Sequence, residues 1–301
     1  MRVTDLRLPV AAVLALGWTL GSVPVRSADA GYAAEIQAWR QTREDGLKAD
    51  GGWLTVAGLF WLKAGSNRFG SADDNEIVLP HSAPARAGRF DVRGAQVTVR
   101  LEPGVSASVE GRAVADGALR ADTTGNADVV SLGPLRMHVI ERGGRLGIRL
   151  KDMDAESRRA FTGLRWYPVD ERYRVTARFV ASPELRPLAV PNVLGQVEKM
   201  PSPGYAVFEM DGREHRLTGV FETPGATELF FIFKDETSGK ETYPAGRFVY
   251  SELPKNGQLV LDFNKAYNPP CAFTAYATCP LPPKENWVGR RIEAGELRYG
   301  H

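Results

Sequence analysis

The sequence predicts an all-β protein, mainly antiparallel, with one helix near its N-terminus. Most of the chain beyond residue 50 alternates apolar with polar residues in short stretches, which is typical of strands with one face toward solvent. Glycine (31 residues) and proline (20 residues) are plentiful, and frequent turns break these stretches. Only residues 31–49 show a convincing helical periodicity. We therefore expect two sandwich- or barrel-like parts preceded by a helix.

The first 30 residues have the features of a cleavable secretory signal peptide. Arg2 and Arg7 give a basic start, residues 8–20 form an apolar run, and Ala28-Asp29-Ala30 places small residues where a signal peptidase reads them. The alternative is an uncleaved membrane anchor, but a spanning helix needs about 20 apolar residues. We expect an exported protein, periplasmic or extracellular, with no membrane span after cleavage.

The charge distribution excludes two classes of partner. The formal net charge of the chain is +2, positive and negative residues are mixed, and no block of five like charges occurs. Nucleic-acid and anionic-membrane surfaces need a concentrated positive field. We therefore expect no nucleic-acid partner.

The predicted helix covers residues 31–49. Tyr32, Ile36, Trp39 and Arg43 lie on one stripe, and the glycines after Asp50 provide a stop signal. We expect this stripe to pack on a sheet.

Strands are predicted in both halves of the remaining chain. In the first half they cover 53–62, 96–101, 105–109, 113–119, 135–139 and 146–150, with a turn at Glu110-Gly111. The stretch 53–62 is nearly continuously apolar and is expected to be buried on both faces. In the second half they cover 173–179, 206–210, 217–221, 228–234, 247–250 and 258–263, with turns at Asp211-Gly212 and Asn256-Gly257. His138 shares the face of Arg136, and Arg149 alternates with Ile148 and Leu150, so these polar side chains are expected on solvent-facing surfaces. The charged stretch 151–159 suggests two units, 31–155 and 156–301.

Residues 64–150 resemble a forkhead-associated β-sandwich. The similarity lies in KAGSNRFGSADDNEIVLP (63–80), SVEGRAVADG (108–117) and VVSLGPLRMHV (129–139). Such domains place an arginine after the glycine of a recognition loop and a histidine in a following Ser-x-x-His motif. Here Gly70 is followed by Ser71, and Ser82 is followed by Ala83, Pro84 and Ala85. The cation that grips phosphate is therefore missing, and phosphopeptide binding is not implied.

A longer resemblance covers most of the mature chain. GWLTVAGLFWLKAGSNRFG (52–70), FTGLRWYPVDERYRV (161–175), FKDETSGKETYPAGRFVY (233–250) and LDFNKAYNPPCAFTAYATCPLPPKEN (261–286) are similar to the bacterial domain-of-unknown-function family 1684. The resemblance implies no reaction, because that family has no assigned role.

The two cysteines lie in the last of these blocks. Cys271 and Cys279 each adjoin a proline, and they are the only cysteines of the chain. In an oxidising compartment they are expected to form a disulfide that staples the loop. A metal site would need further ligands and a redox pair more usually has Cys-x-x-Cys spacing, so we predict no metal site.

Polar residues near this loop are the candidate ligand-binding residues. They are Asp235, Tyr243, Arg247, Asp262, Asn264, Asn268 and Asn286, together with Trp166 from the stretch RWYPVD. Three of them have an alternative: Asp235 also fits a turn cap whose carboxylate accepts backbone N–H bonds, Asp262 fits a solvated position, and Trp166 fits a lid over the charged segment before it. No histidine pair has metal-ligand spacing, and no nucleophile elbow, phosphate loop or dinucleotide fingerprint occurs.

Three functions remain open. The first is a non-catalytic module of the cell envelope that binds a small molecule, a glycan or a protein, with no cofactor. The second is a hydrolase-like enzyme that uses carboxylates such as Asp235 and Asp262, assisted by Tyr243 or Arg247. The third is a structural sandwich that binds a partner through its N-terminal part.

Overall fold

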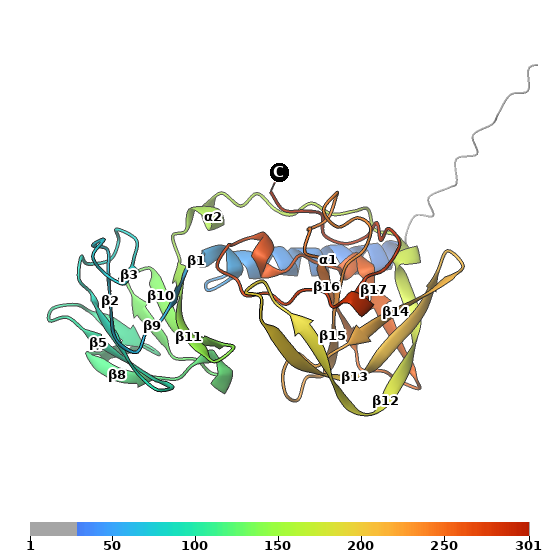
Figure 1. The fold of residues 1–301 in the computed structure, drawn as a ribbon. Coiled ribbons are helices and arrows are strands. Elements are labelled where there is room, and N and C mark those ends of the chain that lie inside the picture. The colour runs from blue at the N-terminus through green and yellow to red at the C-terminus, as the bar shows by residue number, and fades with distance from the viewer. Residues whose placement is uncertain (1–28, 301) are drawn as a thin grey trace, which may run out of the picture.

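The computed structural model of the chain describes residues 29–300. The expected signal peptide, apart from Asp29 and Ala30, lies outside the described residues and stays a prediction. The described chain is mainly antiparallel β-structure arranged in two parts, with one long helix, α1 (Ala30–Lys48), so the predicted fold class is confirmed (Figure 1). No helix within residues 29–300 has the length and apolar character needed to cross a bilayer.

The N-terminal part contains two sheets around one hydrophobic core. The six-stranded sheet has the order β1 (Val56–Trp61), β11 (Arg145–Asp152), β10 (Leu135–Arg142), β9 (Val129–Leu132), β6 (Ala107–Val109) and β7 (Arg112–Val114). The five-stranded sheet has the order β3 (Ile77–Val78), β2 (Gly65–Gly70), β4 (Gly88–Arg93), β5 (Gln96–Leu101) and β8 (Asp116–Leu119). Inward-facing residues such as Phe69, Phe90, Met137 and Ile148 are fully buried in the core between them. The pair β2–β3 is parallel and the other paired strands are antiparallel.

The start of this part differs from the prediction. Residues 53–55 form a 3₁₀ turn, and β1 begins only at Val56. The strand is half-buried over much of its length rather than buried on both faces, because β1 lies at the edge of its sheet.

The C-terminal part has a four-stranded and a two-stranded sheet. The first has the order β14 (Arg213–Gly219), β13 (Val197–Met210), β12 (Arg174–Pro191) and β17 (Gln258–Asp262), and the second pairs β15 (Glu228–Phe233) with β16 (Arg247–Glu252). Their inward side chains form a core that includes Phe231, Phe233, Leu217 and Phe263. A short helix α2 (Glu156–Arg159) lies in the connection between the two parts.

Helix α1 is hydrogen-bonded to the C-terminal part, although the N-terminal sandwich follows it in the sequence. Tyr32 and Ile36 of the predicted stripe are buried, but Trp39 and Arg43 are only half-buried, and Arg40 and Leu47 are buried instead. The hydroxyl of Tyr32 donates to Asp262 Oδ1 at 2.9 Å, and Arg43 Nη2 donates to the carbonyl of Asn268 at 2.9 Å. These hydrogen bonds tie the helix to residues 156–300, and the division near residue 155 stays a prediction.

Three predicted turns have the backbone geometry of tight hairpins. Glu110, Asp211 and Asn256 have φ angles of 49°, 50° and 52°, and each precedes a glycine that also has positive φ. The Asn256 turn was expected to join β16 to β17, but β17 pairs with β12 instead. Only the bridge between Lys255 and Gln258 closes that turn.

Candidate ligand-binding cavity

Strands β10 and β11 place three cationic side chains and the neutral His138 on one face of their sheet. The antiparallel register places His138 opposite Arg149 and Arg136 opposite Lys151. Residues directly opposite one another share a face, so these four side chains project to the same side. This face was expected to be exposed to solvent. Arg149 is instead buried, because the C-terminal part and the loop that carries Thr278 cover this end of the sheet.

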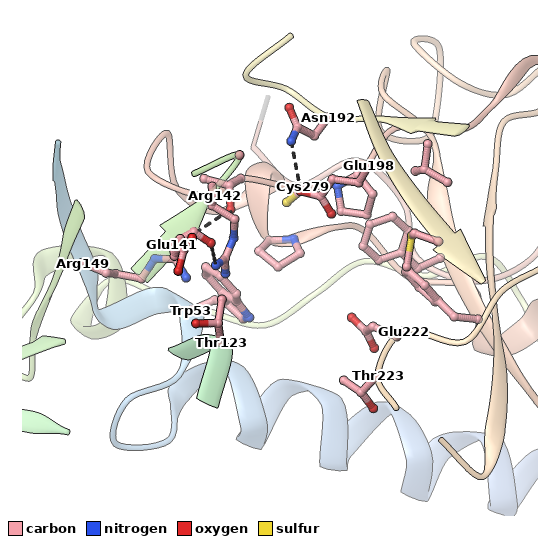
Figure 2. A pocket seen from close by; sticks show the side chains of 18 of the residues that line it. Trp53, Thr123, Glu141, Arg142, Arg149, Asn192, Glu198, Glu222, Thr223 and Cys279 are labelled. Atoms are coloured by element: carbon pink, nitrogen blue, oxygen red, sulfur yellow. Dashed lines mark hydrogen bonds between the residues drawn. The ribbon is translucent and has the colours of Figure 1, made fainter. Parts of the chain in front are cut away.

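A cavity of about 710 Å³ lies between the covered face and the C-terminal part. Its N-terminal wall includes Trp53, Arg142 and Arg149, and its C-terminal wall includes Val190, Met200, Phe230, Phe248, Tyr267, Thr278 and Cys279. Arg142 and Arg149 lie toward one end of the cavity, and Glu222 lies toward the other (Figure 2). The two β parts therefore enclose a space that neither part forms alone.

Arg149 is a buried cation without an acidic partner. Its residue exposure is 5%, its Nε has no hydrogen-bond partner, and its Nη2 reaches only the hydroxyl of Thr278 at 3.4 Å. The guanidinium carbon lies 5.2 Å from the ring centroid of Trp53. No carboxylate within residues 29–300 comes within salt-bridge distance of it. Burial lowers the pKa of Arg149, and the neighbouring Arg142 lowers it further.

Two acidic residues lie near this cluster, Glu141 (Figure 2) and Asp122, and Asp122 is paired with Arg142. Asp122 Oδ2 lies 2.7 Å from Arg142 Nη2, and its Oδ1 accepts the backbone N–H of Glu141 at 3.0 Å. Arg142 Nε lies 3.3 Å from the same Thr278 hydroxyl that Arg149 approaches. Asp122 therefore pairs with Arg142 and acts on Arg149 only from beyond salt-bridge distance.

Aromatic rings form much of the opposite wall. Phe230 and Phe248 meet edge to face at 4.8 Å, and Phe248 meets Tyr267 at 5.8 Å with perpendicular planes. The guanidinium of Arg43 lies 4.5 Å from the Tyr267 ring centroid. Burial raises the pKa of Tyr267, so the wall carries a neutral phenol.

A buried glutamate supports this wall from behind. Glu296 Oε1 accepts from Asn268 Nδ2 at 2.8 Å, and its Oε2 accepts from the backbone N–H of Asn268 at 3.1 Å. Arg43 Nε lies 3.6 Å from Glu296 Oε2. Burial raises the pKa of Glu296 to about 7, because desolvation outweighs these favourable contacts.

Asp235 and Arg247, two of the predicted site residues, are fully buried against each other. Arg247 Nη2 lies 3.3 Å from Asp235 Oδ1 and also donates to the carbonyl of Ile292 at 2.9 Å, and Nη1 donates to the carbonyl of Ala294. Asp235 accepts the backbone N–H of Ile292 at 2.7 Å and that of Thr237 at 3.3 Å. These bonds match the turn-cap alternative for Asp235 and fix the C-terminal segment on the β15–β16 hairpin.

Asp262 and Asn264 belong to a separate network that holds helix α1. Asp262 Oδ1 accepts from the Tyr32 hydroxyl and, at 3.1 Å, from the backbone N–H of Asn264. Asn264 Oδ1 in turn accepts the backbone N–H of Asp170 at 3.0 Å. Asp262 also borders a second cavity, of about 680 Å³, beside the helix. Asp235 and Asp262 thus lie in different hydrogen-bond networks.

The other predicted candidates also have internal partners. Asn286 joins β14 to β15 through the backbone of Thr218 and Ile232, Tyr243 donates to the carbonyl of Cys271 at 3.1 Å, and Asn268 holds Glu296. Trp166 packs edge to face on Trp39 of helix α1 at 5.8 Å, and Arg40 lies 4.9 Å from its ring centroid. None of the eight predicted candidates lies on the wall that contains Arg149. A ligand-binding role for them stays a prediction.

The expected disulfide is not formed in the structure. Cys271 and Cys279 are free thiols whose sulfurs are not at disulfide distance. The backbone N–H of Cys271 donates to Cys279 Sγ at 3.1 Å, and Cys279 lies on the cavity wall. The pairing therefore stays a prediction.

Sequence reasoning missed Arg149, Arg142, Trp53 and Thr278. The available signal was the excess of cations over acids at the outward positions of strands 135–142 and 145–152. Period-two alternation cannot distinguish a face in water from a face covered by a distant segment. Within the described residues no cluster of histidine, cysteine and carboxylate side chains has the arrangement of a metal site.

Parts of the chain are similar to a known family and to solved structures, but these similarities assign no activity to the chain. Residues 159–297 match the family model described as a protein of unknown function (DUF1684). An uncharacterised protein of Haloarcula marismortui solved by NMR is 31% identical, with a TM-score of 0.40, over 47% of this chain and 80% of that one. No curated protein matches the chain.

Two forkhead-associated domains are also similar to part of the chain. The FhaA domain, solved with an intracellular domain of another protein, is 18% identical over 31% of this chain and 97% of its own, with a TM-score of 0.23. The second such domain of a Mycobacterium tuberculosis ABC transporter is 26% identical over 29% of this chain and 77% of its own, also with a TM-score of 0.23.

Proposed function

The chain belongs to the DUF1684 family, and from that premise we propose that it is an exported binding protein that holds a small molecule between its two β parts. The observation that carries the proposal is the cavity of about 710 Å³ with aromatic side chains on one wall and an arginine without an acidic partner on the other.

The size and the lining of the cavity support a small-molecule site. Ligand pockets typically have volumes of about 300–1,000 Å³, mostly apolar linings and a few fixed polar groups, and they favour interfaces between domains. Phe230, Phe248 and Met200 supply the apolar surface, and Arg149 and Thr278 supply polar groups. Because the proposed site uses both parts of the fold, binding would also hold them together.

Occupancy of the cavity is tested with the neutral fluorescent probe N-phenyl-1-naphthylamine, whose emission rises in apolar surroundings. Met200→Trp fills the cavity from strand β13 and should reduce probe affinity at least tenfold. Val197→Trp on the same strand is the matched control, because Val197 is 64% exposed and lies outside the cavity wall. Equal binding by both variants and the wild type would reject the cavity as the site. No binding by the wild type would favour the partner-binding alternative.

We also propose that the protein is exported and that Cys271 and Cys279 then form a disulfide. The basic, apolar and small-residue segments of residues 1–30 support secretion, and Cys271 and Cys279 would then reside in an oxidising compartment. Mass spectrometry of protein purified from the periplasm should find the chain without residues 1–30 and two hydrogens lighter than its reduced form. Quantitative alkylation of both thiols without prior reduction would reject the disulfide.

A further inference from the structure

We infer that the small molecule is an amphipathic anion whose oxyanion group binds Arg149 and whose apolar body lies against the aromatic wall. This inference rests on the proposed function, since it assigns a chemical class to the ligand of that cavity.

On the cationic face, Lys151 and Arg142 already have partners. Lys151 lies on this face, but its Nζ donates to the carbonyl of Gly51 at 2.6 Å. Arg142 is paired with Asp122. Arg149 remains as the buried cation without a carboxylate, with an Nε that has no partner at all. A ligand anion at this point would supply the missing countercharge.

The Arg149 guanidinium also has the hydrogen-bonding geometry that an oxyanion needs. A guanidinium presents its donors in a planar fork that matches the two oxygens of a carboxylate, sulfonate or phosphate group. Trp53 lies against the Arg149 guanidinium at 5.2 Å, and the Thr278 hydroxyl lies within 3.4 Å of both Arg149 and Arg142. These contacts fix the orientation of the fork, so it is organised before an anion arrives.

The acidic residues at the far end of the cavity limit the number of charges on the ligand. Glu198 and Glu222 border the cavity away from Arg149, and Glu222 accepts a hydrogen bond from the hydroxyl of Tyr250. A second anionic group at that end would face these carboxylates and be repelled. The cavity therefore favours a ligand with one charged end and an apolar, preferably planar, body beside Phe230 and Tyr267.

The test compares two probes that share a naphthylamine ring system. 1-Anilinonaphthalene-8-sulfonate carries one sulfonate, and N-phenyl-1-naphthylamine is its neutral counterpart. Arg149→Met should weaken binding of the sulfonate probe about tenfold or more and change binding of the neutral probe less than twofold. Arg145→Met is the matched control, because Arg145 lies on the same strand and also stacks on a tryptophan, with 4.3 Å to the Trp61 centroid, but is exposed and outside the cavity.

The outcomes separate this inference from the proposed function. Equal losses for both probes, or no loss for either, in Arg149→Met would overturn the anion assignment and leave the cavity as a binding site. Failure of the wild type to bind either probe would remove the proposed function itself. Near-ultraviolet circular dichroism confirms folding, and Arg149→Gln repeats the comparison with a polar, uncharged side chain if the methionine variant does not fold.

Discussion

Arg149→Met should make the ligand-free protein more stable, although it removes a residue proposed to bind the ligand. The guanidinium is buried at 5% residue exposure, and nothing acidic within residues 29–300 lies within salt-bridge distance of it. A side chain retained against its cost in stability is a common signature of a functional site.

The magnitude follows from the contacts that the substitution removes. The variant loses one long hydrogen bond to Thr278 and the contact with Trp53, which together contribute about 1–2 kcal/mol. It also removes the desolvation cost of a buried ion, which is several kcal/mol after relaxation, and the repulsion from Arg142. Methionine keeps much of the apolar volume. We expect the free energy of unfolding to rise by about 2 kcal/mol and the melting temperature to rise by about 4–8 °C.

Urea and thermal unfolding of the purified protein measure this change, in a buffer without phosphate or sulfate so that no anion pairs with Arg149. Arg145→Met should shift the melting temperature by less than about 2 °C, because that arginine is exposed. If Arg149→Met lowers the free energy of unfolding by more than about 1 kcal/mol while Arg145→Met is neutral, Arg149 is a stabilising core residue and the reasoning fails.

Three further predictions concern the buried networks outside the cavity. Arg247→Met should lower the free energy of unfolding by about 3–5 kcal/mol, since it leaves Asp235 buried without its cation. In urea titrations, the double variant with Asp235→Asn should lose less free energy of unfolding than the sum of the two single variants. The folded-state pKa of Glu296, about 7, is above its ordinary 4.5, so its contribution to stability is complete below pH 4.5 and is lost as the pH rises through about 7. Relative to wild type, Glu296→Gln should therefore become more stable by about 3 kcal/mol between pH 4.5 and 8 in pH-dependent urea titrations. Tyr32→Phe should cost about 1–3 kcal/mol in the same assay, because it removes a buried hydroxyl that donates to Asp262.

Exposed residues with the same charge or the same side chain provide the controls. Lys255→Met, Glu293→Gln and Tyr276→Phe should each change the free energy of unfolding by less than about 0.5 kcal/mol. An Arg247→Met variant as stable as Lys255→Met would contradict the role of the buried pair. A Glu296→Gln variant with the same pH dependence as wild type would show that Glu296 does not titrate in this range, and a neutral Tyr32→Phe would show that its hydroxyl does not hold the helix.

Much of the fold followed from local sequence features. Asp211-Gly212 and Glu110-Gly111 predicted tight turns, and both pairs adopt the positive φ angles that such turns require. Alternation predicted the strand at 96–101, an apolar run predicted a strand at 228–234 that the structure has at 228–233, and the stripe that contains Tyr32 and Ile36 predicted α1. These features are readable because turn geometry and side-chain periodicity depend on residues only a few positions apart.

The roles of the polar residues near the cysteine loop could not be predicted from the local sequence. Their identities and their tendency to cluster were visible in the sequence, but Asp235 and Asp262 lie in separate buried networks and bond to distant backbone and side chains. A short polar side chain has the same sequence appearance whether it binds a ligand or satisfies a buried N–H. Only the positions of Ile292 and Tyr32, both remote along the chain, show that these carboxylates hold the fold together.

The sequence by itself determined many of the strands and turns, and period-two alternation placed Arg136, His138 and Arg149 on outward, largely cationic faces. The tertiary structure decided that part of this cationic face is buried and that its Arg149 lacks an acid. The physical reason is that burial depends on what packs against a strand, and the segment that covers Arg149 carries Thr278, which is 129 positions away in the chain. Period-two alternation specifies a face, and the packing of distant segments determines whether that face meets water or encloses a cavity.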